Sequence, residues 1–159
     1  MAERIRIEVS ISAPLDLAWH AWTKTDRMTL WFAPEANIEA SPGGPFELFF
    51  DPSDHNHEST KGCKFTSVQP KSQLGFTWKG PDQFARIMNN RDSLTSVLVT
   101  FHEEGESTRV VVEHMGWRKG KRWKKAQVWH EKAWKEVLGS LKSALESGKG
   151  LLCCAPEKK

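Results

Sequence analysis

The chain has 159 residues, and its 23 lysines and arginines against 20 aspartates and glutamates give a formal net charge of +3. This length suits one domain with its own hydrophobic core, and so small a charge excess gives no reason to expect nucleic-acid binding. The sequence has no apolar stretch typical of a signal peptide or a membrane-spanning helix, and its three cysteines do not make a disulfide framework. We therefore expect a cytoplasmic protein, and we take it to be a monomer.

The first 34 residues predict a strand and two short helices. Residues 5–11 alternate apolar and polar side chains, as a strand with one buried face does. Pro14 suits the first turn of a helix. The apolar residues of that helix recur at helical spacing: Leu15, Ala18, Trp19 and Trp22. A second short helix is expected to end near Trp31, because Pro34 stops it.

Six further segments predict the strands of an antiparallel sheet: residues 36–40, 45–50, 62–68, 74–78, 93–102 and 108–115. Turn residues such as Pro42 and Gly43 separate them. Residues 80–92 form a polar excursion between the fourth and fifth of these strands, in which Phe84 and Met88 have helical spacing. We expect a short, lid-like helix or a loop there.

One long helix is predicted after the strands. Apolar residues recur every 3.6 positions for more than 20 residues from Trp123, and Ser147 with Gly148 suits the end of that helix. The apolar stripe would stay in water unless the helix lay across the concave side of the sheet. We expect one domain over residues 1–148 and a flexible tail over residues 149–159.

Short motifs follow one another along residues 5–147 in a characteristic order. They are Ala13-Pro14, Trp19, Ala21-Trp22-Thr23, Leu30-Trp31-Phe32-Ala33-Pro34, Gly43-Gly44-Pro45-Phe46, Leu74-Gly75-Phe76-Thr77-Trp78, residues 108–114, and Ala133-Trp134 with Leu138 and Leu141. Together they resemble the Bet v 1-like, START-related (SRPBCC) helix-grip superfamily, and within it the activator of Hsp90 ATPase homologue 1-like branch. The chain departs from that branch at Ala133, where the family often has glycine, and in a strongly basic approach to the last helix.

The resemblance implies an α+β helix-grip fold with the order β-α-α-β6-α. In this fold a curved antiparallel sheet wraps around the long C-terminal helix and leaves an internal cavity. The resemblance implies no single activity, because members of the superfamily range from lipid carriers and hormone sensors to polyketide cyclases and chaperone activators.

Side chains that face inward from two strands and from the helix are expected to line this cavity. Alternation places His114 on the same face as Val110 and Val112, and His130 lies one helical turn before Trp134. The predicted ligand-binding set is Phe76, Trp78, Val110, Val112, His114, His130 and Trp134, an aromatic lining with two polar points. The alternative explanation is that the histidines are core residues with satisfied hydrogen bonds and that the aromatics only pack.

A basic cluster lies at the start of the long helix: Arg118, Lys119, Lys121, Arg122, Lys124 and Lys125. Cations at a helix N-terminus oppose the helix dipole, so their number there invites a functional explanation. We predict a partner-binding set for an acidic protein, made of Trp31, Phe32, Lys121, Arg122, Lys124 and Lys125. The alternative is a charged face that is simply solvated.

No catalytic, cofactor or metal-binding residue is predicted. His55 and His57 lie among acidic residues in a polar loop, but no second ligand pair accompanies them, so a plain hairpin loop is expected. Cys153 and Cys154 have neither metal spacing nor a histidine partner, and Cys63 fits a small buried residue of a strand. Phosphate-binding and hydrolase motifs are missing from the sequence.

Three hypotheses follow from the sequence. The leading one is a small non-enzymatic domain that binds an apolar molecule, a lipid or an aromatic metabolite, in a central cavity of roughly 300 Å³ or more. The second is a protein-interaction module resembling the Hsp90 activator domain, whose binding weakens with salt. The third is a cyclase- or hydratase-like enzyme with His114 or His130 as general acid or base.

Overall fold

The computed structural model describes residues 4–147. Strand β1 (Ile5–Ile11) leads into helices α1 (Leu15–Thr23) and α2 (Thr25–Met28). Six strands follow: β2 (Glu35–Ile38), β3 (Phe46–Phe49), β4 (Phe65–Gln69), β5 (Gln73–Trp78), β6 (Thr95–Glu104) and β7 (Ser107–Met115). Short helical segments separate β5 from β6: η1 (Asp82–Phe84), α3 (Ala85–Met88) and η2 (Arg91–Ser93). The long helix α4 (Lys121–Ser147) comes last.

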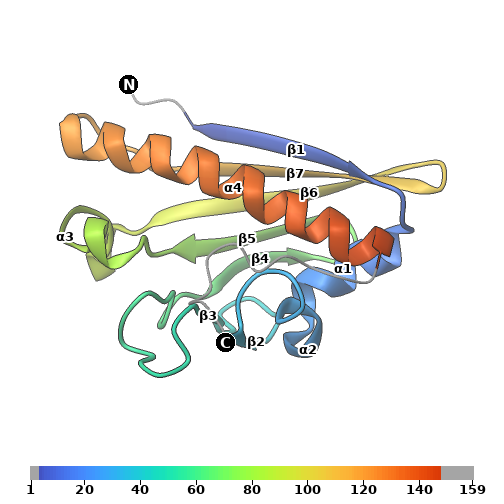
Figure 1. Ribbon diagram of the computed structural model, residues 1–159, viewed down its shortest axis with the longest axis horizontal. Coiled ribbons are helices and arrows are strands. Elements are labelled where there is room, and N and C mark those ends of the chain that lie inside the picture. The colour runs from blue at the N-terminus through green and yellow to red at the C-terminus, as the bar shows by residue number, and fades with distance from the viewer. Residues whose placement is uncertain (1–3, 148–159) are drawn as a thin grey trace.

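The sheet is antiparallel and has five strands in the order β1-β7-β6-β5-β4. Strands β2 and β3 form a second, smaller sheet, which isolated bridges from Pro45 to Lys64 and from Phe49 to Ser59 join to the segment before β4. Helix α4 runs across the face of the large sheet, and α1 and α2 lie near its C-terminal end (Figure 1). The predicted α+β helix-grip fold and its order of elements are confirmed.

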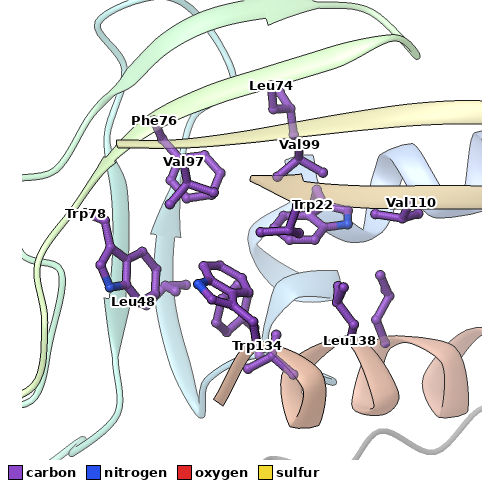
Figure 2. Close-up of a cluster of buried hydrophobic side chains, with 14 of the residues drawn as sticks. Trp22, Leu48, Leu74, Phe76, Trp78, Val97, Val99, Val110, Trp134 and Leu138 are labelled. Atoms are coloured by element: carbon purple, nitrogen blue, oxygen red, sulfur yellow. The ribbon is translucent and has the colours of Figure 1, made fainter. Parts of the chain in front are cut away.

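The core forms where the inward faces of the strands meet the apolar stripe of α4. Val110 and Val112 of β7 are fully buried, as the alternation predicts, and Leu138 and Leu141 of α4 are buried with them. Figure 2 shows Trp22 from α1 in the same cluster. Burying each such side chain contributes about 1.5–3 kcal/mol to the stability of the fold.

The second helix is shorter than expected. It ends at Met28, and a tight turn follows in which the Phe32 amide donates to the Met28 carbonyl. The Trp31 indole donates to the Ala21 carbonyl at 3.0 Å, and the Trp31 carbonyl accepts a hydrogen bond from Ser140 of α4 at 2.8 Å. These bonds turn the segment into the core, so the stop comes from tertiary packing before Pro34 is reached.

Within residues 4–147, no helix is long and apolar enough to cross a membrane. The predicted tail, with Cys153 and Cys154, lies outside the described residues. Cys63 is buried, and burial raises the pKa of its thiol to about 11, which agrees with a small core residue.

Candidate ligand-binding site

A pocket of about 350 Å³ lies between the middle of α4 and the loops that follow β3 and β5. Its apolar walls are mostly aromatic rings, with a valine, an alanine and a proline beside them: Phe32, Phe50, Trp78, Trp129, Trp134, Val137, Ala133 and Pro81. Polar side chains stand at its edge: Glu58, Ser59, Lys79, Lys132 and Glu136. Its volume falls in the range of small-molecule sites, and so does its composition of apolar walls with a few polar groups.

Three of the predicted ligand-binding residues line this pocket, namely Trp78, His130 and Trp134. The other four, Phe76, Val110, Val112 and His114, are fully buried in the core and lie outside its lining. Ring packing explains part of the difference, because Phe76 stacks on Phe46 with ring centroids 3.7 Å apart. The hollow is therefore displaced from the centre of the sheet towards the loops at one side of α4.

Sequence reasoning missed Phe50 and Trp129 as lining residues. Phe49 and Phe50 are adjacent in an extended segment, so their side chains leave on opposite faces and cannot both enter one core. Trp129 lies beside the buried stripe of α4 and is 36% exposed. In both cases the sequence feature that could have identified the residue was a large aromatic side chain next to a buried position.

His114 sits behind the pocket as a neutral hydrogen-bonding residue. The Trp134 indole N–H donates to its Nδ1 at 3.0 Å, and because this nitrogen accepts, Nε2 carries the proton. Nε2 therefore donates to the Thr95 hydroxyl at 2.9 Å, and that hydroxyl donates on to the Trp78 carbonyl at 3.4 Å. Each N–H and O–H group in this series of hydrogen bonds therefore has an acceptor.

His130 repeats the arrangement one helical turn before Trp134. The Trp78 indole donates to its Nε2 at 3.2 Å, so Nδ1 carries the proton and donates to the Ala126 carbonyl at 2.8 Å. Gly80 allows the close packing here, because a Cβ at that position would lie 3.4 Å from the His130 ring and 2.6 Å from the sulfur of Met88.

Both imidazoles are held in the neutral form. Burial lowers the pKa of His130 to about 4, and burial together with the neighbouring His130 lowers that of His114 well below its usual range. Their rings lie 5.3 Å apart, so protonating both would also place two charges together in the core. All four ring nitrogens are already hydrogen-bonded, which leaves none directed at the pocket for acid–base chemistry.

The expected partner-binding residues divide into two groups. Trp31 and Phe32 are each 1% exposed, so the structure corrects the prediction that they form a partner-binding surface. Their burial follows from ring packing. The ring centroids of Phe32 and Trp134 are 5.7 Å apart, and those of Trp31 and Trp22 are 4.8 Å apart. Phe32 takes part in the pocket wall instead.

The basic residues at the start of α4 are on the surface. Lys121, Lys124 and Lys125 are exposed, and no carboxylate among residues 4–147 forms an ion pair with them. Arg122 differs, because its guanidinium donates to the Gln83 carbonyl at 2.7 Å. It therefore fastens α4 to the short helical segment after β5.

The histidines of the polar loop lie against carboxylates, and His57 faces two of them, since its Nε2 also lies 3.9 Å from an Asp54 oxygen. His55 lies 2.5 Å from a Glu35 oxygen, and His57 lies 2.7 Å from an Asp82 oxygen. Over the part of the chain that the structure describes, no three metal-ligating side chains come together.

Solved structures with the same fold carry two kinds of description. The Aha1 dimer from Colwellia psychrerythraea is 21% identical with a TM-score of 0.72, over 94% of this chain and 100% of that one. An Hsp90 activator from Plasmodium falciparum is 16% identical with a TM-score of 0.67, over 91% and 96%. DynU16, from the dynemicin biosynthetic locus, is 20% identical with a TM-score of 0.70; the match covers 94% of this chain but only 49% of DynU16. At these identities the likeness shows the fold alone.

No curated protein matches the chain. A family match nevertheless covers most of it: residues 12–146 match the family described as activator of Hsp90 ATPase homolog 1-like protein. That stretch begins just before α1 and includes nearly all of α4, and so contains the whole pocket lining. The chain therefore belongs to the activator of Hsp90 ATPase homologue 1-like family.

Proposed function

We propose that this protein binds an apolar, planar small molecule, such as an aromatic metabolite, in the pocket beside α4. The observation that carries the proposal is a space of about 350 Å³ whose apolar walls are mostly aromatic rings. A flat ring system suits such walls, because offset-stacked and edge-on ring contacts add about 0.5–1.5 kcal/mol per pair beyond the burial of apolar area.

The binding test uses the indole N–H signals of Trp78, Trp129 and Trp134, which line the pocket. Polycyclic aromatics and fatty acids are titrated into the labelled protein and followed by two-dimensional NMR. We expect the aromatics to shift these three signals more than that of Trp117, which lies outside the lining. A panel in which no compound moves them would overturn the proposal.

A variant that fills the pocket sharpens this test. Ala133 lines the pocket, so Ala133→Phe places a phenyl ring in it. We expect affinity for the best compound to fall at least tenfold, which corresponds to about 1.4 kcal/mol. Val128→Phe is the matched control, because Val128 lies on the same helix, is 55% exposed and does not line the pocket. Equal binding by both variants would place the ligand elsewhere.

A second candidate function is activation of an Hsp90-type chaperone through the start of α4. Its support is that Lys121, Lys124 and Lys125 are exposed and unpaired by carboxylates within residues 4–147, on a chain of the Hsp90-activator-like family. Such a cluster attracts an acidic surface at low ionic strength.

The test is the ATPase rate of purified Hsp90 with and without this protein. If the second candidate is right, the rate rises, the rise weakens with salt, and the triple reversal of Lys121, Lys124 and Lys125 to glutamate abolishes it. Lys24→Glu with Lys64→Glu is the control, since both lysines are exposed and neither belongs to α4. No stimulation at low salt would reject this function.

The geometry gives least support to the cyclase or hydratase hypothesis. His114 does not reach the pocket, and the nitrogens of His130 are engaged by Trp78 and Ala126. A bound substrate would have to displace the Trp78 indole to reach the accepting nitrogen of His130. Loss of turnover in a His130→Gln variant that still folds would be needed to revive it.

A further inference from the structure

The loop between β3 and β4 forms one side of the pocket. Phe50, which begins this loop, and Glu58 and Ser59, further along it, line the space. Between them, the ring of His55 stacks on Phe49 with centroids 4.0 Å apart. The loop is therefore a wall of the pocket that carries the two histidines left unexplained by the binding function.

Both histidines tie the loop to other elements. His55 lies 2.5 Å from the Glu35 carboxylate on β2, and His57 lies 2.7 Å from Oδ2 of Asp82 in η1. These partners are 20 and 25 residues away in sequence, so the contacts join separate segments.

Asp82 and Glu58 also hold each other. The Glu58 amide donates to Oδ1 of Asp82 at 3.0 Å, and the Asp82 amide donates to Oε2 of Glu58 at 3.1 Å. We call these two bonds and the His57–Asp82 pair the clasp. Because Pro81, next to Asp82, also lines the pocket, the clasp closes the gap between the two loops that border it.

The clasp is one of several contacts that keep the loop closed, beside the bond from the Phe50 amide to the Glu58 carbonyl at 3.0 Å and the His55–Glu35 pair. Glu58 has a φ of +50°, in the left-handed region that is unfavourable for a residue with a Cβ. Such a conformation persists only where its surroundings hold it. Releasing the bonds to Asp82 therefore also releases backbone strain, which favours movement of this segment.

The charges around His57 make the clasp sensitive to protons. Asp82 faces it from η1, and Asp54 and Glu58 face it from its own loop, while the nearby Lys61 is bound to the Asn56 side chain. The hydrogen bond to Asp82, followed by the attraction of these carboxylates, raises the pKa of His57 above 6.5. The closed loop thus binds the proton more tightly than an open loop would.

We propose that residues 50–59 form a lid over the pocket, which the clasp holds closed most firmly when His57 is protonated and which opens more often once His57 loses its proton. The lid's effect on a ligand rests on the proposed binding function, whereas its motion does not. Because the pair is exposed, the effect is modest, at most about fivefold in the open population.

The first measurement follows the lid without any ligand. The His57 ring signals and the Glu58 and Asp82 amide signals are recorded by NMR from pH 5.5 to 9. We expect all three to titrate together with one midpoint above 6.5, and the protection of the Glu58 amide from hydrogen exchange, corrected for its intrinsic rate, to fall above it. Independent titration, or protection that does not change with pH, would overturn the lid.

The second measurement uses N-phenyl-1-naphthylamine, an apolar fluorophore without a group that titrates in this range. We expect it to associate up to about fivefold faster at pH 8.5 than at pH 6. His57→Asn and Asp82→Asn should remove this dependence, and His102→Asn, which changes an exposed histidine on β6, should keep it. The same dependence in His57→Asn as in the parent protein would refute the proposal.

The two measurements separate the two ideas. If the fluorophore fails to bind at every pH while the three signals titrate together, the lid stands and the proposed ligand class fails. If the fluorophore binds with a rate independent of pH, the pocket stands and the lid fails.

Discussion

The two ends of α4 cover the same face of the sheet, but what lies beneath them differs. Under the C-terminal end, Leu138 faces Val110 of β7 (Figure 2), and Leu141 is buried in the same core. Under residues 129–137 the walls are aromatic rings at mixed angles, 74° between Phe32 and Trp134 but 29° between Phe32 and Trp78. Branched aliphatic side chains interdigitate to crystal-like density, whereas a few large rigid rings have fewer ways to fill a space completely. The same helix therefore packs tightly against the core near its C-terminal end and forms one side of the pocket in its middle.

The strongest test of this contrast is a substitution that creates a cavity beneath the C-terminal end of α4. Leu138→Ala removes a side chain that is 1% exposed, and we expect the free energy of unfolding to fall by about 2–5 kcal/mol. Urea denaturation measures the loss. Leu145→Ala, at a partly buried position on the same helix, should cost less. If ligand affinity fell as steeply as stability while the variant remained folded, the two ends would not be independent.

Acid should destabilise the protein through its two buried histidines, His130 and His114. In the unfolded chain His130 has a pKa near 6.5, against about 4 in the fold, so below pH 6.5 the unfolded state gains a proton that the folded state does not. The free energy of unfolding should therefore fall by roughly 3 kcal/mol by pH 4, and His114 adds to the loss in the same direction.

Urea midpoints at several pH values test this dependence. His130→Gln keeps hydrogen-bonding atoms but does not titrate, so its profile should be flatter between pH 6.5 and 4. A profile as steep as that of the parent protein would mean that other groups cause the acid sensitivity.

The smallest expected effect compares two buried tryptophans. Trp134→Phe leaves Nδ1 of His114 without a donor, while Trp22→Phe removes an indole N–H that has no hydrogen-bond partner among residues 4–147. Both substitutions lose similar volume, so the first should cost about 1–3 kcal/mol more than the second. Equal losses in thermal or urea unfolding would show that the Trp134–His114 bond adds nothing net.

Most of the fold could be predicted from local patterns in the sequence. Alternation in residues 5–11 and 108–115 marked strands, and the stripe from Trp123 marked the helix, because both depend only on spacing along the chain. The pattern also placed His114 and Trp134 on inward faces, where they meet.

The site depended on distances that spacing does not encode. The sequence predicted a cavity lined by Val110 and Val112, but volume decides which inward residues fill space and which border it, and these valines fill it. In the same way, the clasp needs the fold to bring Asp82 beside His57 across 25 residues.

Strand β1 has a consequence for how copies of this chain meet. It is an edge of the five-stranded sheet, and edge strands invite pairing with other chains. Here the strand carries Arg6 and Glu8 on its exposed side, the two paired with each other, and Arg109 of β7 adds to the charges. A neighbouring strand would have to strip these charges of water before it could hydrogen-bond to β1. We therefore expect concentrated solutions to resist sheet-to-sheet aggregation along this edge until salt or neutralising substitutions weaken the charges.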